Sequence, residues 1–157
     1  MSLHVSIGEL AETLAEPDDE DFVPPTRALF EKLASALEAR GLPRFEEPDT
    51  LPPDALERGG QLSPQGLAKL SKLVDSWGRY PQLHLVGPES LFVPLDFHEA
   101  LEVDGYRVGS AQRLLGELEQ VSAELGSYVD SLVRHNLDLL LDTARASLEH
   151  RSAMLIG

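Results

Sequence analysis

Hydrophobic positions repeat at helical spacing in four long segments of the chain. Leucines and other apolar residues fall three or four positions apart in residues 24–40, 63–77, 111–125 and 127–148. Apolar side chains at this spacing line one face of an α-helix, while polar residues occupy the opposite face. The pattern therefore predicts four amphipathic helices, and the last two are close enough in sequence to form an antiparallel hairpin.

The ends of these helices carry residues that favour helix starts and stops. Ser63 followed by Pro64 is typical of an N-cap and a first helical position, and Ser110 and Ser127 are placed to cap the last two helices. Gly126, between those two helices, is a typical helix stop. These signals define the predicted helix boundaries more closely than periodicity alone.

A shorter helix is predicted near the N-terminus. Residues 6–9, Ser-Ile-Gly-Glu, have the Ser-x-x-Glu form of a capping box, and apolar positions follow at helical spacing until Pro17. An acidic run of four residues comes next, and mutually repelling like charges are typical of a solvated loop. We therefore expect residues 1–22 to form an N-terminal helix and acidic segment, and residues 23–157 to form a single globular domain.

Strand signals are concentrated between the second and third long helices. Leu83–Val86 and Leu91–Val93 are short apolar runs joined by a turn that contains Gly and Pro, and they predict two strands. The Asp-x-x-Glu pattern at residues 96–99 predicts one or two helical turns, as far as Leu101. Asp104-Gly105 is the dipeptide preferred in tight hairpins. The sheet is therefore predicted to be antiparallel and small, with two to four strands.

Residues 42–61, between the first and second long helices, contain four prolines and a Gly-Gly pair. Both residue types interrupt regular backbone hydrogen bonding, so this segment predicts a long surface loop with a single helical turn near Asp54 to Arg58. Together these patterns predict an α+β fold. We expect a mostly helical single domain with a small antiparallel sheet and a C-terminal antiparallel helix hairpin.

The composition is strongly acidic. Against 27 Asp and Glu there are 13 Lys and Arg, which gives a formal net charge of −14 in 157 residues. Such a charge repels nucleic acids and anionic lipids, and no apolar run reaches the roughly 18 residues that a membrane span requires. It suits a basic protein partner, or it serves solubility alone. The candidate docking strip for such a partner is the acidic run Asp18, Asp19, Glu20 and Asp21.

The chain has no cysteine. This excludes disulfides, thiolate metal sites and cysteine nucleophiles, and it fits a reducing compartment such as the bacterial cytoplasm. The N-terminal residues lack the basic and apolar regions of a secretory signal. There is also no glycine-rich nucleotide-binding motif and no catalytic or zinc motif, so the sequence predicts no cofactor and no metal.

Candidate chemistry lies between Leu91 and Leu115, where strand, turn and helix-start signals meet. Free backbone N–H groups around Ser110, with the guanidinium groups of Arg107 and Arg113, have the composition of a phosphate or carboxylate site at a helix N-terminus. The alternative is that Ser110 is only an N-cap and that the arginines pair with nearby glutamates.

Two other kinds of site would use the same stretch. Ser110, with His98 as base and Asp96 as the orienting carboxylate, has the residue types of a hydrolytic triad, although no nucleophile-elbow motif surrounds the serine. These three residues are the catalytic candidates. A metal site would need the strand and the following turn to converge. Its ligands would be His84, His98, Asp96 and Glu99.

The sequence favours a non-enzymatic function. An acidic chain without catalytic motifs suits a small interaction or inhibitor protein, similar to the immunity proteins that neutralise basic toxins or nucleases. The alternative is a small-molecule or anion site in residues 91–115, in a sensor or a hydrolase. The apolar stripe of the last helix is long for one small domain to cover, so monomer and homodimer are both open.

Overall fold

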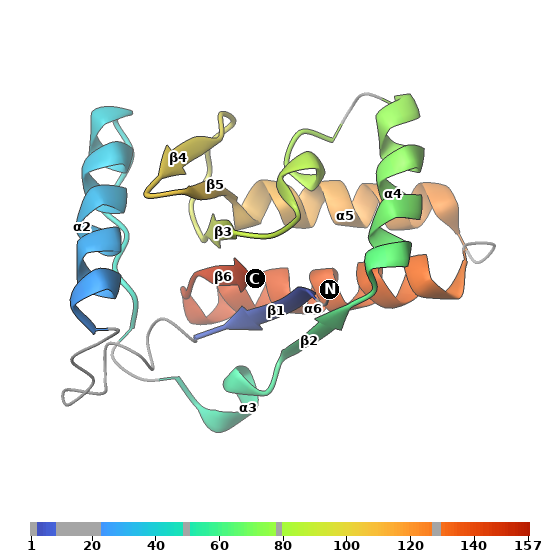
Figure 1. The fold of residues 1–157 in the computed structure, drawn as a ribbon, viewed down its shortest axis with the longest axis horizontal. Coiled ribbons are helices and arrows are strands. Elements are labelled where there is room, and N and C mark those ends of the chain that lie inside the picture. Colours follow the sequence, from blue (N-terminus) through green and yellow to red (C-terminus); the bar gives the residue numbers. More distant parts are fainter. Residues whose placement is uncertain (1–2, 9–22, 49–50, 78–79, 127–129) are drawn as a thin grey trace.

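The computed structural model describes residues 3–8, 23–48, 51–77, 80–126 and 130–157, which form one sheet with helices on both faces (Figure 1). The sheet has six strands in the order β2-β1-β6-β3-β5-β4. The strands are β1 (Leu3–Ile7), β2 (Gly59–Leu62), β3 (Ser90–Val93), β4 (Leu101–Val103), β5 (Tyr106–Ser110) and β6 (Met154–Ile156). The helices are α2 (Val23–Ala39), α3 (Pro53–Leu56), α4 (Pro64–Trp77), α5 (Ala111–Leu125), α6 (Ser131–His150) and the 3₁₀ helix η1 (Leu83–Leu85).

The sheet is larger than the sequence predicts, and the prediction of a mostly helical domain with a small antiparallel sheet of two to four strands is wrong. β3 and β5 run parallel while the other neighbours are antiparallel, so the six-stranded sheet is mixed. The sequence pattern assigns none of β1, β2 and β6 to a strand. Each has only three to five residues. Segments this short are stable as strands because partners far away in sequence satisfy their backbone groups.

β1 stands where the sequence predicts the start of a helix. Leu3, Val5 and Ile7 are buried while the two residues between them are more exposed, which is the two-residue period of a strand. The capping-box pattern at residues 6–9 is therefore misleading, and the helix prediction is wrong for Ser6 and Ile7, which belong to β1. The rest of that predicted helix, the acidic run and the predicted boundary at residue 22 lie outside the described residues.

β1 and β6 are neighbours in the middle of the sheet, although they come from opposite ends of the sequence (Figure 1). Their ladder extends beyond the strand ends. The His4 N–H donates to the Gly157 carbonyl at 2.7 Å, and the Gly157 N–H donates to the His4 carbonyl at 3.0 Å. This pairing joins the β2-β1 half of the sheet to the half that contains β3, β5 and β4.

The sheet separates two hydrophobic cores. Helices α4, α5 and α6 cover one face, to which the strands contribute Val5, Phe92 and Met154. Helix α2 packs on the other face, to which β3 contributes Leu91 and Val93. β3 is fully buried because its alternate side chains enter different cores. α5 and α6 lie side by side and run in opposite directions (Figure 1), as the predicted helix hairpin requires.

The four long helices and the Asp104-Gly105 hairpin are confirmed. Both turn residues have a positive φ, 54° and 87°, as a tight turn between β4 and β5 requires.

Two local predictions are wrong: Leu83–Val86 contains η1 in place of a strand, and residues 96–100 form no helical turn before β4. The predicted loop at residues 42–61 contains α3, close to the expected helical turn, and most of β2.

The apolar stripe of α6 is covered within the chain. Val133, Leu137, Leu140 and Ala144 are at most 1% exposed, and α6 contacts α4, α5 and three strands. The length of this apolar stripe therefore no longer favours a homodimer. Within the described ranges, the chain contains no helix with the length and apolar character needed to cross a bilayer.

A buried asparagine connects α6 to the start of α4. Asn136 has no exposed surface. Its Oδ1 accepts the Ser63 N–H at 2.8 Å, and its Nδ2 donates to the Ser63 carbonyl at 2.8 Å. Ser63 caps α4 as predicted, because its Oγ accepts the Gly66 N–H at 3.0 Å. A Cβ at Gly66 would lie only 2.6 Å from Asn136 Nδ2, so the two helices approach closely at this glycine.

Replacing Asn136 by alanine should lower the free energy of unfolding by about 1–3 kcal/mol, because two backbone groups of Ser63 lose their partner. The control is Arg145→Ala, at an exposed position on the same helix. It should change the free energy of unfolding by less than about 0.5 kcal/mol. Urea unfolding of both variants measures the difference. Equal losses in the two variants would contradict the role assigned to this contact.

Candidate functional site

Several predicted site residues lie around a hollow that follows β3. The hollow has a volume of about 330 Å³, and we refer to it as the Asp96 hollow. It brings together the predicted residues Asp96, His98 and Arg113, and it adds Arg40, which follows α2 and has no sequence motif to mark it. The full lining is Arg40, Leu42, Asp96, Phe97, His98, Glu99, Leu101 and Arg113.

Both arginines of the Asp96 hollow are paired with carboxylates. The Arg113 Nε lies 2.7 Å from Asp96 Oδ1, and the Arg40 Nη1 lies 2.9 Å from Glu99 Oε2. Their charges are thus already compensated, and an incoming anion would have to displace a carboxylate of the same molecule. This arrangement does not favour the predicted anion site.

Ser110 is completely buried and acts as the N-cap of α5. Its Oγ accepts the Arg113 N–H at 3.2 Å and donates its own proton to the Leu95 carbonyl. Among the described residues, no hydrogen bond joins Ser110 to His98, and a hydrolytic triad depends on such a bond. The N-cap role of Ser110 is confirmed, and the geometry does not support a nucleophilic role for this serine. The expected pairing of the arginines with glutamates is not found, because Arg113 pairs with Asp96 and Arg107 donates to a backbone carbonyl.

The remaining predicted ligands are scattered. Arg107 points to a turn, where its Nη2 donates to the Pro88 carbonyl at 3.4 Å, so the three residues of the predicted anion site do not converge. Of the four metal candidates, His84 lines a separate small hollow beside α4, while the other three line the Asp96 hollow. No group of three or more His, Asp or Glu side chains that could hold a metal ion occurs in the part of the chain that the structure describes.

Gln82 holds the predicted stretch together, and sequence reasoning missed it. The side chain is 1% exposed. Its Oε1 accepts the Ser110 N–H at 3.0 Å, and its Nε2 donates to the His98 carbonyl at 3.3 Å. A Cβ at Gly109 would lie 2.5 Å from Gln82 Oε1, so the amide needs a glycine beside it. A single glutamine has no sequence signature, because its partners are set only by tertiary structure.

Glu117 explains why residues 83–86 do not form a strand. Its carboxylate accepts the Gln82 N–H at 2.9 Å and the Leu83 N–H at 3.0 Å. These bonds satisfy two free donors at the start of η1, as a side-chain cap does. Burial raises the pKa of Glu117, and the two N–H donors act in the opposite direction.

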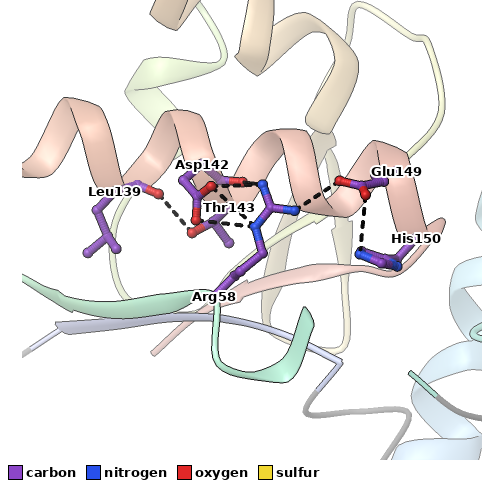
Figure 2. A network of polar contacts seen from close by, with 6 residues as sticks. All are labelled: Arg58, Leu139, Asp142, Thr143, Glu149 and His150. Carbon is purple, nitrogen blue, oxygen red and sulfur yellow. Dashed lines mark hydrogen bonds and ion pairs between the residues drawn. The ribbon is translucent and has the colours of Figure 1, made fainter. Parts of the chain in front are cut away.

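Arg58, which lies between α3 and β2, forms a polar network with α6 (Figure 2). Its Nη2 donates to Asp142 Oδ1 at 2.7 Å and to the Asp142 carbonyl at 3.1 Å, and its Nη1 donates to Glu149 Oε2 at 2.9 Å. The hydrogen bond with Asp142 is the largest cause that raises the pKa of Arg58. The network fastens the α3–β2 segment to α6 and uses two carboxylates of the outer face of that helix.

Glu47 is a partly buried acid that sequence reasoning also missed. Its Oε2 accepts the Ser152 hydroxyl at 2.6 Å, and its Oε1 accepts the Ala153 N–H at 2.7 Å. These bonds tie the segment after α2 to the turn between α6 and β6. Burial raises the pKa of Glu47 to about 7, although both hydrogen bonds favour the ionised form. The carboxyl group therefore changes charge near neutral pH.

Comparisons with protein-family models, with curated proteins and with solved structures give no match for this chain. Functional inference therefore rests on the residues of the chain and their geometry. The geometry described so far favours structural roles for the predicted catalytic and anion-binding residues.

Glu47 should make the folded chain less stable as the pH rises towards 7. The ordinary pKa of a glutamate is 4.5, and the folded value is about 7. The folded state therefore holds an extra proton between these values, and its stabilising effect is full below pH 4.5 and lost as the pH rises through 7. Glu47→Gln cannot ionise. Relative to wild type, its free energy of unfolding should therefore decline less over this range, by about 1–3 kcal/mol.

The measurement is urea unfolding at a series of pH values, with Glu46→Gln at the exposed neighbouring position as the control. The control should follow the wild-type pH dependence. Parallel curves for wild type and Glu47→Gln would show that Glu47 does not titrate as described.

Proposed function

We propose that this chain is a non-enzymatic interaction protein of the bacterial cytoplasm. It binds a basic protein partner through its acidic surface, as an inhibitor or immunity protein does. The single observation that carries the proposal is the charge balance. The net charge is −14, and most described cations are used within the chain, so the surface presents an excess of carboxylates.

The described Lys and Arg side chains are largely taken up by internal ion pairs. These pairs are Lys32–Asp104, Arg40–Glu99, Arg44–Glu46, Arg58–Asp142, Lys69–Asp130, Arg113–Asp96 and Arg134–Asp138. Other carboxylates are exposed and have no ion pair with a described residue: Glu31, Glu38, Asp54, Glu57, Glu89, Glu102 and Glu119. They are spread over helices, strands and turns. The negative electrostatic field of these carboxylates attracts a basic partner and speeds its association.

The acidic run Asp18 to Asp21 is part of this proposal as the docking strip, although it lies outside the described residues. Its four carboxylates follow one another without a cation between them. A lysine- or arginine-rich surface of a partner would meet several charges at once there, and such a contact favours affinity at low ionic strength. The alternative small-molecule site in residues 91–115 is supported by the Asp96 hollow, which three of its predicted residues line. It is the weaker proposal because Ser110 serves as an N-cap and Arg113 pairs with Asp96.

The experiment is capture of partners on the immobilised full chain, followed by affinity measurement with the purified partner at several salt concentrations. We expect a basic protein whose Kd weakens by about tenfold or more between roughly 0.05 and 0.3 M salt, because screening removes the attraction between the two surfaces. A partner of neutral or acidic composition, an affinity independent of salt, or the absence of any specific partner would contradict the proposal.

Two charge variants test the docking strip. One carries Asp18→Asn, Asp19→Asn, Glu20→Gln and Asp21→Asn. The matched control carries Glu57→Gln, Glu89→Gln, Glu102→Gln and Glu119→Gln, so that both variants lose the same charge. The first should weaken binding more than the second, by about tenfold. Equal weakening would assign the binding to overall charge and remove the strip from the proposal.

A further inference from the structure

A second hollow, larger than the Asp96 hollow, opens at the C-terminal end of α6. Its volume is about 570 Å³, within the range of about 300–1,000 Å³ that is typical of small-molecule sites. We refer to it as the Arg151 hollow. Three segments far apart in sequence line it, with Arg44, Phe45 and Glu46 after α2, Leu95 after β3, and Leu148 and Arg151 at the end of α6.

The walls of the Arg151 hollow are held by contacts within the chain. The Leu95 carbonyl accepts the Ser110 hydroxyl, and the Leu95 N–H donates to the Val93 carbonyl at 2.8 Å. Glu47 anchors the segment next to Arg44 through its bonds to Ser152 and Ala153. A hollow whose walls are fixed in this way loses little conformational freedom when a ligand binds.

Arg151 is fixed as the C-cap of α6 and carries an uncompensated charge. Its φ of 53° is left-handed, and its N–H donates to the Ser147 carbonyl. It has no ion pair with a described residue, unlike Arg40 and Arg113 in the Asp96 hollow. An unpaired guanidinium group at the rim of a hollow is a ready donor to a carboxylate, especially in so acidic a chain.

Arg44 supplies a second cation that is easily released. Its Nε lies 3.1 Å from Glu46 Oε1, but the two side chains are 52% and 75% exposed. An exposed pair of this kind contributes little, about 0–1 kcal/mol, so a ligand anion competes with Glu46 at small cost. Glu46 is the one acidic side chain in the lining, which leaves the hollow with a positive balance.

The lining of the Arg151 hollow also includes apolar side chains. Phe45 is only 5% exposed, and its ring centroid lies 6.0 Å from that of Phe30. Leu95 and Leu148 are partly exposed on the lining. A lining that combines charged groups with apolar side chains can hold an amphiphilic small molecule.

We propose that the Arg151 hollow binds a small organic carboxylate with an apolar body, of the aryl or short-chain fatty acid class. The carboxylate lies against Arg151 and Arg44, and the apolar part covers Phe45, Leu95 and Leu148. An inorganic phosphate would use only the guanidinium groups, and an uncharged analogue would use only the apolar side chains. The site is independent of the acidic docking strip, so each proposal stands or fails by itself.

The experiment is a titration of the ¹⁵N-labelled chain followed by backbone amide chemical shifts. The probe is 4-phenylbutyrate. The matched controls are 4-phenylbutanol, which lacks the negative charge, and inorganic phosphate, which lacks the apolar body. We expect saturable shifts near residues 44–47, 94–96 and 147–152 with a Kd of about 1 mM or tighter, and at least about tenfold weaker binding of both controls. Equal binding of either control, or no saturable shift at these residues, would overturn the proposal.

Three variants connect the binding to named side chains. Arg151→Asn retains a residue that tolerates the left-handed backbone, and Arg44→Gln removes the second charge. Each should weaken 4-phenylbutyrate binding by about tenfold, while Arg145→Gln, an exposed arginine of the same helix, should leave it unchanged. The amide spectrum of each variant reports its folding. Unchanged binding by both folded test variants would overturn the assignment.

Discussion

The pairing of β1 with β6 is the constraint on which the rest of the structure depends. Val5 lies opposite Ile156, and Ile7 opposite Met154, so two short segments near opposite ends of the sequence pair inside the sheet, and neither is an edge strand. β6 follows α6 after only a few residues, and its position therefore sets where α6 crosses the sheet. α6 in turn positions α4 through Asn136 and the α3–β2 segment through Arg58. Such a distant contact has a large loop-closure entropy cost, which burial of both hydrophobic cores offsets.

Buried polar side chains in this fold serve its architecture. Ser110, Gln82 and Asn136 are at most 1% exposed, and each satisfies backbone groups that would otherwise lack partners in the interior. Gln82 joins η1, the turn at His98 and the start of α5. Ser110 caps α5 and Asp96 pairs with Arg113. Among the described residues no hydrogen bond joins Ser110 to His98, so the stretch resembles a triad in composition only.

Many charged side chains also serve the architecture of the fold. Most described cations neutralise a carboxylate of the same chain, which strengthens contacts between elements and leaves the acidic excess facing solvent. Arg151 is among the cations that have no ion pair with a described residue, and it lines a hollow that also contains apolar side chains. Glu47 is a partly buried carboxylate with no ion pair to a described residue. Burial raises the pKa of its carboxyl group to about 7, while two hydrogen-bond donors hold it in place. The described part of the chain therefore combines an excess of exposed carboxylates with a locally positive hollow.

The sequence by itself determined the four long helices, the Asp104-Gly105 hairpin and the N-cap roles of Ser63 and Ser110, because periodicity, caps and turns depend on neighbouring residues. Only the tertiary structure decided the rest. β1 has the local pattern of a helix start, yet pairing with β2 and β6 makes it a strand, while Glu117 turns Leu83–Leu85 into η1. The Arg151 hollow likewise needs three distant segments. Such features depend on partners remote in sequence, whose positions no local pattern encodes.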